Sequence, residues 1–306
     1  MRKASLSQCS GSVDILCGKT QEETMPDGSW RDRTDTGKSG ARLTQAEIEQ
    51  YNRDGYVIPD FRIPDDMLTE MRNALDALME ANPTLAADNM LCPHLLNAGV
   101  QGLKGDRVWL DFAAYPEILD MVEQLIGPDF LLWGTTVFGK PAFSGKEVPW
   151  HQDGEYWPIR PLATCSAWVA LDDTTPENGC LRVIPGSHKD KRLRKHHTDD
   201  GDHLALNQAL DESEYREEDA VDFVLKAGQV SFHDVYIVHG SKPNRSPNRR
   251  AGYVCRYMPT TSHFDHDYGA ELQQKSGIVD FSGRRVILMR GKDACGKNDF
   301  SRGADT

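Results

Sequence analysis

Two short segments of the chain carry imidazole and carboxylate groups at a spacing that suits a metal ion. His151 and Asp153 are separated by one residue, so in an extended backbone both side chains project to the same side and can reach one ion. His239 lies 86 residues after Asp153, at the end of an apolar, strand-like run. A His-x-Asp pair alone is a weak signal, because surface and structural pairs are common, and either histidine could be a buried structural residue. The second histidine strengthens the metal-site interpretation.

Two imidazoles and one carboxylate form a donor set with a specific chemistry. On one face of an octahedral ion they leave three neighbouring positions open, which is the facial triad of non-haem Fe(II) oxygenases. Such an enzyme needs a two-electron co-reductant, commonly 2-oxoglutarate, whose distal carboxylate must be held. A guanidinium provides a planar, bidentate partner for a carboxylate. Arg250, eleven residues beyond His239 at the start of the next expected strand, is the candidate, and Arg256 has the same strand parity and could assist.

Three ordered blocks of sequence carry a family resemblance. They are His151-Gln-Asp153, Asn178-Gly-Cys-Leu-Arg-Val-Ile-Pro-Gly-Ser-His188 and the segment from His239 to Arg250. Together they resemble the phytanoyl-CoA dioxygenase family of Fe(II)/2-oxoglutarate-dependent oxygenases, and the likeness extends from about residue 43 to about residue 262. The resemblance implies a double-stranded β-helix (a cupin-like jelly roll) with helices packed outside. It also implies a dioxygenase that hydroxylates an unactivated C–H bond of a small molecule, consuming 2-oxoglutarate and O2 and releasing succinate and CO2. The segment 157–160 and the basic run of the loop after His188 favour a polar or anionic substrate.

The same resemblance implies roles for individual residues. By motif position, the iron ligands would be His151, Asp153 and His239. Arg250 would bind the 2-oxoglutarate carboxylate with Ser241 hydrogen-bonding to it, and Trp168 would flank the cosubstrate. Because halogenating relatives lack the carboxylate ligand, Asp153 indicates hydroxylation rather than chlorination.

One ambiguity concerns two adjacent arginines. Neighbouring side chains on a strand point to opposite faces, so only one of Arg249 and Arg250 can enter a pocket. The eleven-residue spacing from His239 and the Ala251-Gly252 that follows favour Arg250.

Four further residues are candidates for substrate contacts. Tyr156 and Trp157 follow the His-x-Asp motif and could equally be core aromatics. His233 shares strand parity with His239 and could contact substrate, support a ligand or be structural. Lys140 could bind an anionic group but, like Arg160 and Arg182, could also be a solvated charge.

The elements that must position these residues change in character along the chain. Capping signals and apolar periodicity predict helices over about 44–53, 64–80 and 116–126. Strand-like runs occupy 55–58, 130–138, 164–171, 230–238 and 252–257, so an α+β, mainly β fold is expected. Residues 1–41 are predicted to be a disordered leader, 42–292 the catalytic domain and 293–306 a flexible tail. The charged stretch 189–222 is predicted to be a long insertion that serves as a lid, and its basic run 189–197 could grip an anion.

Composition narrows the function classes. With 47 acidic and 35 basic residues the net charge is −12, which disfavours general nucleic-acid binding. No apolar run is long enough for a membrane span. Seven scattered cysteines favour a reducing cytoplasm over a disulfide framework. Oligomeric state has no signature in the sequence. Two rival functions stay open: a cupin-like metal protein of different chemistry, and an inactive binding relative.

Overall fold

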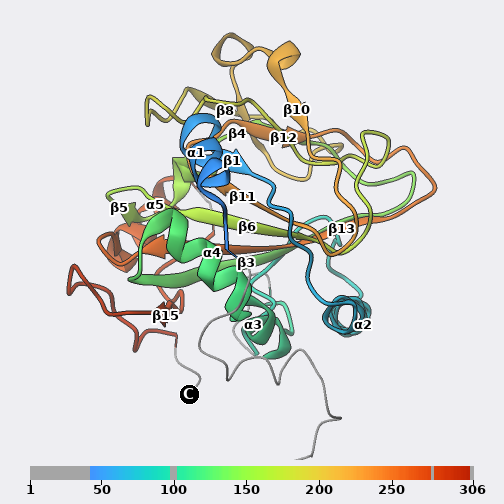
Figure 1. Ribbon diagram of the computed structural model, residues 1–306. Coiled ribbons are helices and arrows are strands. Elements are labelled where there is room, and N and C mark those ends of the chain that lie inside the picture. Colours follow the sequence, from blue (N-terminus) through green and yellow to red (C-terminus); the bar gives the residue numbers. More distant parts are fainter. Residues whose placement is uncertain (1–41, 97–101, 277–278, 304–306) are drawn as a thin grey trace, which may run out of the picture.

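Two antiparallel sheets form the centre of the protein, one above the other (Figure 1). The computed structural model describes residues 42–96, 102–276 and 279–303, so the leader predicted for 1–41 lies outside the described residues. The larger sheet contains, in spatial order, β1 (Tyr56–Val57), β11 (Val230–Asp234), β6 (Cys165–Ala170), β13 (Arg250–Pro259), β3 (Phe130–Lys140) and β15 (Ile287–Arg290), with β2 (Met90–Leu91) also paired to β3. The smaller sheet contains β10 (Val221–Asp222), β7 (Arg182–Val183), β12 (His239–Ser241) and β4 (Val148–His151).

Helices and short hairpins complete the fold. The helices are α1 (Gln45–Asp54), α2 (Asp65–Ala81), α3 (Val108–Ala113), α4 (Pro116–Ile126) and α5 (His266–Ser276). Two strand pairs lie outside the main sheets, β5 (Ile159–Arg160) with β14 (His263–Phe264) and β8 (His196–Thr198) with β9 (Gln208–Leu210). The structure is therefore a mixed α and β fold with a sheet core, as the sequence predicts.

The first helix shows why the sequence folds locally as predicted. The Thr44 side chain accepts a hydrogen bond from the Glu47 backbone N–H, and the Glu47 carboxylate accepts one from the Thr44 N–H, which completes a capping box. At the other end Gly55 adopts φ 83°, a left-handed conformation that glycine reaches without a Cβ penalty. Helix α1 thus begins and ends where side-chain chemistry satisfies its terminal backbone groups.

Alternation along the central strands separates two apolar clusters. On β6, Ala167 and Val169 face the helices and belong to the large cluster that includes Met71 of α2. Trp168, between them, faces the smaller sheet and packs in a second cluster with Val254 of β13. The helices therefore bury the outer face of the larger sheet, and the inner face remains available for a site between the sheets.

The apolar run 230–238 is two structural elements rather than the one strand that the sequence predicts. Strand β11 ends at Asp234, whose carbonyl oxygen accepts a hydrogen bond from Ile237 N at 3.1 Å in a turn. The chain then crosses to the smaller sheet, where β12 begins at His239. The predicted shared parity of His233 and His239 is therefore wrong, because the two residues come from opposite sheets.

The C-terminal segment corrects a second expectation. Residues 293–303 pack on the body instead of forming the predicted flexible tail. Cys295 N donates to Thr260 O at 2.9 Å, and the Asn298 side chain accepts a hydrogen bond from Phe264 N at 2.9 Å. Phe300 packs against a cluster of buried aromatic and aliphatic residues. A polar segment is ordered here because its side chains and backbone satisfy hydrogen-bonding groups next to β14.

Two further features agree with the composition. Among the described residues, no helix is both long and apolar enough to cross a lipid bilayer. The five cysteines in the described part of the chain are free thiols, and four of them are buried.

Candidate metal centre

Two buried histidines lie side by side on the smaller sheet. His151 ends β4, His239 begins β12, and the two are direct partners across the ladder. The Nδ1 atom of His151 lies 2.8 Å from the Pro149 carbonyl oxygen, and that of His239 lies 3.0 Å from the Ile237 carbonyl oxygen. A carbonyl oxygen only accepts hydrogen bonds, so each Nδ1 carries the proton and each Nε2 keeps a free lone pair. This is the tautomer that a metal-binding histidine needs.

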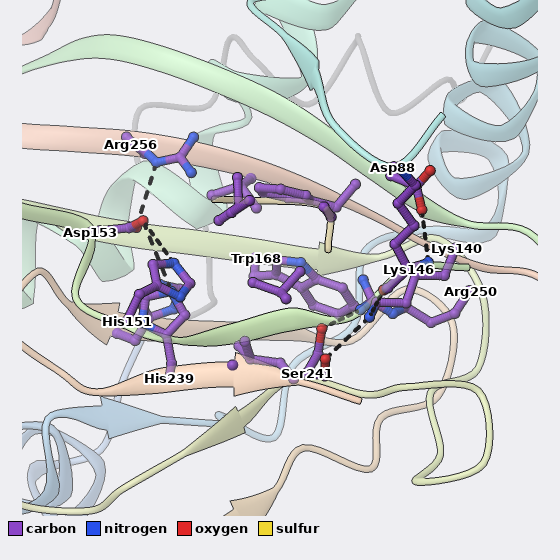
Figure 2. Close-up of a pocket in the computed structure, with 18 residues that line it drawn as sticks. Asp88, Lys140, Lys146, His151, Asp153, Trp168, His239, Ser241, Arg250 and Arg256 are labelled. Carbon is purple, nitrogen blue, oxygen red and sulfur yellow. Dashed lines mark hydrogen bonds and ion pairs between the residues drawn. The ribbon is translucent and has the colours of Figure 1, made fainter. Parts of the chain in front are cut away.

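Asp153 completes the cluster (Figure 2). Gln152 has extended backbone angles, φ −118° and ψ 128°, so the side chains on either side of it project in one direction, as the spacing predicts. Asp153 Oδ1 lies 3.5 Å from His151 Nε2 and 3.9 Å from His239 Nε2. The donor atoms of all three residues lie within 4.8 Å of one another. The donor set and its orientation therefore fit a single divalent ion such as Fe(II).

Local electrostatics keep the donors in the protonation states that a cation requires. Burial raises the pKa of Asp153, but the charge of Arg256 and the two neighbouring imidazoles outweigh it and hold that pKa well below its usual range. Burial, reinforced by His151, lowers the pKa of His239 to about 3. At neutral pH Asp153 is a carboxylate and His239 is a neutral imidazole.

Arg256 lies at the metal end of the cavity rather than at the cosubstrate end. Its Nε lies 3.8 Å from Asp153 Oδ2 (Figure 2). Its Nη1 donates to Thr136 Oγ1 at 2.6 Å. The sequence predicts that Arg256 could assist Arg250, but the structure places it beside the carboxylate. Its strand parity was predicted correctly, because both arginines line the same cavity.

The cavity between the sheets extends from the histidines to Arg250 (Figure 2). Arg250 is 3% exposed, and its Nε and Nη2 donate to Gly179 O at 2.9 and 2.6 Å. Its Nη2 also lies 3.3 Å from Ser241 Oγ, and its guanidinium carbon lies 5.8 Å from the centre of a Trp168 ring. Burial lowers the pKa of Arg250 to about 10, so the group remains a cation at neutral pH. The structure thus brings together all three residues predicted to contact the cosubstrate.

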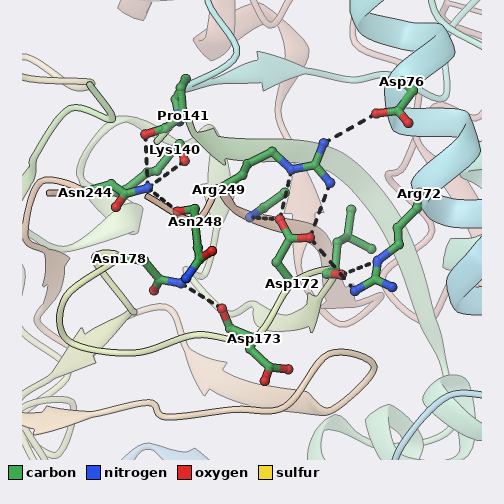
Figure 3. Close-up of polar contacts among 12 residues, drawn as sticks. Arg72, Asp76, Lys140, Pro141, Asp172, Asp173, Asn178, Asn244, Asn248 and Arg249 are labelled. Atoms are coloured by element: carbon green, nitrogen blue, oxygen red, sulfur yellow. Dashed lines mark hydrogen bonds and ion pairs between the residues drawn. The ribbon is translucent and has the colours of Figure 1, made fainter. Parts of the chain in front are cut away.

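Arg249 points to the opposite face of β13 (Figure 3). Its Nε donates to Asp172 Oδ2 at 3.0 Å, and its Nη1 lies 3.4 Å from Asp76 Oδ1 on α2. This arginine is held by carboxylates outside the cavity. The geometry therefore favours Arg250 for the cosubstrate.

Lys140 lines the cavity but has no free hydrogen-bond donor. Its Nζ donates to the carbonyl oxygens of Lys146, Ser241 and Lys242 at 2.5, 3.3 and 2.6 Å. An ammonium group has three N–H donors, and the backbone takes all of them. Burial and the nearby charge of Arg250 lower the pKa of Lys140 to about 6, so at neutral pH the group is mainly a neutral amine. Its two N–H donors are likewise taken up by the three carbonyl oxygens. The predicted contact between Lys140 and substrate is not favoured by this geometry, in which Lys140 ties two loops together.

His233 reaches the centre from the larger sheet. Its ring centroid lies 5.3 Å from that of His239, and burial lowers its pKa to about 4. Its Nδ1 is buried without a hydrogen-bond partner among the described residues. His233 lies next to the metal cluster, as predicted, but reaches it from across the sandwich.

A second cavity opens on the other side of Asp153. Both Tyr156 and Trp157 line it, and Trp157 packs edge-on against Trp133 with ring centroids 4.3 Å apart. Its volume is about 200 Å³, at the small end of ligand sites. The remaining wall includes Phe281 and Arg284. We call this space the second cavity.

The insertion 189–222 covers both cavities. Leu206, in the loop before β9, lines each of them, and the Tyr156 hydroxyl donates to Gln208 Oε1 at 2.5 Å. Gln152 anchors the insertion: its Nε2 donates to Arg192 O at 3.1 Å and its Oε1 accepts from Arg194 N at 2.7 Å. The Gln152 side chain therefore points away from the metal cluster, as expected for the middle residue of an extended triplet.

Two cations of the basic run in this insertion have acidic partners within the insertion. Arg192 pairs with Glu214 at 3.0 Å, and Lys195 pairs with Asp211 at 2.7 Å. These cations therefore do not face a substrate site. Arg182 likewise pairs with Glu217 and Asp222, and Arg160 donates to the carbonyl oxygens of Trp157 and Ile159.

Sequence reasoning missed three residues of the second cavity, namely Trp133, Phe281 and Arg284. Trp133 lies in a run that is recognisable as a strand, but nothing marks it as facing a site. Phe281 and Arg284 follow the region that carries the family resemblance and belong to no motif. No signal in a single sequence distinguishes this arginine from a solvated one.

A two-sheet core with a buried His-Asp-His cluster and an internal guanidinium defines a non-haem, Fe(II)- and 2-oxoglutarate-dependent dioxygenase. The phytanoyl-CoA dioxygenase (PhyH) family matches residues 51–252. The chain belongs to this family, and the cofactors expected from the resemblance agree with it.

Individual relatives share the same framework at low identity. The human peroxisomal phytanoyl-CoA dioxygenase is 28% identical over 239 residues, covering 72% of this chain and 70% of that protein. Ectoine dioxygenase of Stutzerimonas stutzeri is 26% identical over 266 residues, covering 78% and 85%. Among solved structures, the non-haem monooxygenase ThoJ is 27% identical with a TM-score of 0.59, covering 82% and 85%. The structure of EctD from S. alaskensis with 2-oxoglutarate and 5-hydroxyectoine, 23% identical with a TM-score of 0.59 over 74% and 80% of the chains, shows the same fold.

Proposed function

We propose that this protein hydroxylates an unactivated C–H bond of a small polar or anionic molecule, with release of succinate and CO2. The observation that carries the proposal is the continuous cavity with the His151, Asp153 and His239 donors at one end and the Arg250 guanidinium at the other. 2-Oxoglutarate has a chelating keto acid and a distal carboxylate. The cavity offers partners for both ends of this molecule.

In this proposal His151, Asp153 and His239 hold Fe(II), Arg250 and Ser241 hold the distal carboxylate, and Trp168 flanks the cosubstrate. When bound, Fe(II) with 2-oxoglutarate and O2 supplies the oxidising power that cleaves the C–H bond.

The protein orients the metal-binding side chains and keeps water away from the reacting centre. The backbone carbonyls behind the two histidines fix the imidazole rings and their tautomers. Phe138, Leu181 and Val254 line the cavity with apolar surface, which limits the access of water to the reacting centre. Asp153 occupies the position that halogenating relatives leave open for halide, which supports hydroxylation as the outcome.

The proposal extends to the fold, which we assign as a double-stranded β-helix. Successive strands alternate between the sheets: β3, β6, β11 and β13 lie in the larger sheet, and β4, β7 and β12 follow them in turn in the smaller one. Such alternation is what a jelly roll requires. It explains why His151 and His239, separated by 88 residues in sequence, meet on adjacent strands.

The test is anaerobic titration of the protein with Fe(II) and 2-oxoglutarate, followed by the weak visible charge-transfer band of the chelate. We expect the band in the wild type and its loss in His239→Ala. His233→Gln is the matched control, because it alters a buried imidazole in the same cavity that is not a proposed ligand, and the band should persist. Iron binding without the band would instead support a cupin-like metal protein of different chemistry, and failure to bind iron would support an inactive relative.

A further inference from the structure

Arg284 is a buried cation that lacks a carboxylate partner. It is 6% exposed, and its Nη1 donates to the sulfur of Cys92 at 2.7 Å. Within the described parts of the chain, no carboxylate oxygen lies within 4 Å of its guanidinium nitrogens. A thiol is a weak acceptor, so this contact does not neutralise the charge. Burial of a charge without a partner is costly, and Arg284 faces the second cavity, where a ligand could supply the missing anion.

Among the described residues, none of the ionisable groups near Arg284 forms a salt bridge with its guanidinium. Burial, together with Arg284 and Arg285, lowers the pKa of His94 to about 3, so the imidazole behind this wall is neutral. Asp280 is exposed and accepts a hydrogen bond from Ser282 N at 2.8 Å. The Ser282 hydrogen bonds, and then the charge of Arg284, lower the pKa of this carboxyl, but among the described residues the two side chains form no salt bridge within 4 Å. Arg256, the other cation of the second cavity, already faces the Asp153 carboxylate. Arg284 is therefore the cation whose charge remains to be matched.

The backbone leaves room for this guanidinium. A Cβ added at Gly134, in the middle of β3, would lie 3.3 Å from Arg284 Nη1, closer than most real Cβ contacts. Gly134 pairs with Arg256 across the ladder, so the Arg284 side chain lies against the strand just beside the metal-facing residue. The glycine allows Arg284 to approach the floor of the cavity.

One side of the second cavity is aromatic, whereas polar side chains such as Thr136 and Gln208 line another part of it. Trp133 and Phe281 have ring centroids 6.5 Å apart, and Trp157 packs on the other side of Trp133. The guanidinium carbon of Arg284 lies 5.1 Å from the centre of the Phe281 ring. The buried Nε1–H of Trp133 has no hydrogen-bond partner among the described residues. The second cavity thus combines one cation that has no carboxylate partner with an aromatic wall beside Asp153.

We infer that Arg284 binds the carboxylate of the substrate, and that the substrate is a small monocarboxylate with an apolar or aromatic body held between Trp133, Trp157 and Phe281. One planar guanidinium matches a carboxylate in charge and geometry, whereas a phosphate dianion would remain only partly compensated. The volume of about 200 Å³ favours such a molecule over a complete acyl-CoA thioester. This inference rests on the proposed function, because it assumes that the substrate in the second cavity is oxidised at an iron ion held by Asp153 and the two histidines.

The test measures binding to the anaerobic protein loaded with Fe(II) and saturating 2-oxoglutarate, which fills the site at Arg250. The probes are hydrocinnamate and hexanoate, their neutral amides, and phenethylphosphonate. Quenching of tryptophan fluorescence and the shift in melting temperature report binding. We expect the carboxylates to bind roughly 10- to 100-fold more tightly than the amides. Arg284→Gln should remove this preference, and Arg284→Lys should keep part of it.

Two variants separate recognition from structure. Arg302→Gln alters a nearby arginine that pairs with Asp267 and Asp299 outside the cavity, and it should leave carboxylate binding unchanged. Cys92→Ser alters the neighbour of Arg284 while retaining the cation, and it should preserve the preference for carboxylate over amide.

The outcomes are distinguishable from those of the proposed function. The charge-transfer band is recorded first in every sample, and its absence from the wild type would refute the proposed function itself. With the band present, equal binding of acid and amide, an unchanged preference in Arg284→Gln, or no carboxylate binding at millimolar concentration overturns the inference. Tighter, Arg284-dependent binding of the phosphonate overturns the assignment of a carboxylate.

Discussion

Gly252 lies beneath the indole of Trp168, and a Cβ at Gly252 would be only 2.1 Å from Trp168 Cζ2. The two residues belong to the neighbouring strands β13 and β6. The indole can lie flat across β13 only because residue 252 has no side chain. Its ring is thereby held close to the Arg250 guanidinium, so a backbone position sets the wall of the cosubstrate end of the cavity.

We predict that Gly252→Ala displaces Trp168 and weakens both the fold and the cosubstrate site. Overpacking of this kind costs about 1–3 kcal/mol in the free energy of unfolding. Urea denaturation measures this loss, and the charge-transfer titration measures the accompanying decrease in 2-oxoglutarate affinity. Gly283→Ala is the control, because a Cβ there meets nothing within 4 Å. Equal stability of the two variants would contradict the prediction.

Arg250→Ala should affect cosubstrate binding, whereas Arg249→Ala should affect only stability. Loss of Arg250 removes the cation at the closed end of the cavity, and we expect the KM for 2-oxoglutarate to rise by about 30-fold or more, since truncating a buried charged partner costs roughly 2–5 kcal/mol. Loss of Arg249 leaves this KM unchanged but lowers stability, because Asp172 loses a charged partner. The pair is compared by succinate release at varied 2-oxoglutarate. A larger KM change in Arg249→Ala would transfer the role to that residue.

The stability of the metal-free protein should decrease as pH falls below neutral. Burial, and then Arg284 and Arg285, lower the pKa of His94 to about 3. Histidines of the unfolded chain titrate at about pH 6.5. Between that pH and the folded pKa of about 3, His94 is protonated in the unfolded chain and neutral in the folded one. Each pH unit of acidification in this range therefore lowers the free energy of unfolding by about 1.4 kcal/mol. The stabilisation that comes from a neutral, buried His94 is fully present above about pH 6.5 and is lost progressively as the pH falls.

Denaturant unfolding of the metal-free protein at neutral and mildly acidic pH measures this slope. His94→Gln, whose amide can replace the contact with Thr135, should flatten the slope, while His197→Gln on the surface should not. Identical slopes in the wild type and His94→Gln would show that His94 does not titrate as described.

Gln152→Ala should loosen the insertion over the cavities. The variant loses the hydrogen bonds to Arg192 and Arg194, which connect the His-x-Asp segment to the insertion, and a further one to the Tyr236 carbonyl oxygen. We expect faster hydrogen exchange in residues 192–210 and more succinate release in the absence of substrate, because water reaches the centre more easily. Tyr156→Phe removes one hydrogen bond, to Gln208, and should produce a smaller change. Unaltered exchange in Gln152→Ala would exclude this anchoring role.

Local chemistry made much of the fold predictable. Features that depend on neighbours in sequence could be predicted, namely the capping box of Thr44 and Glu47, the glycine after α4 and the apolar strands. The facial triad could be predicted because the His-x-Asp triplet is a local pattern and only one further histidine, His239, had to be found. Arg250 could be distinguished from Arg249 by strand alternation, and the structure shows the two on opposite faces.

The failures have physical causes. The turn after β11 contains neither glycine nor proline, so the chain reversal between Asp234 and His239 looks like continuous strand. The order of residues 293–303 depends on Asn298 meeting the edge of β14, a contact with no local signature. The same limit conceals Arg284, whose burial arises from packing against Gly134 and Cys92, distant in sequence.

The three donors of the metal cluster differ in how firmly the backbone holds them. His151 and His239 are paired across β4 and β12 and anchored through their own carbonyl neighbours, whereas Asp153 begins a single 3-10 turn outside the ladder. A change of residue 153 therefore removes one negative charge from the centre without breaking a strand pairing. The fold therefore separates a pair of imidazoles held by strand pairing from a carboxylate carried by a turn, so the charge of the centre and the integrity of the sheet depend on different residues.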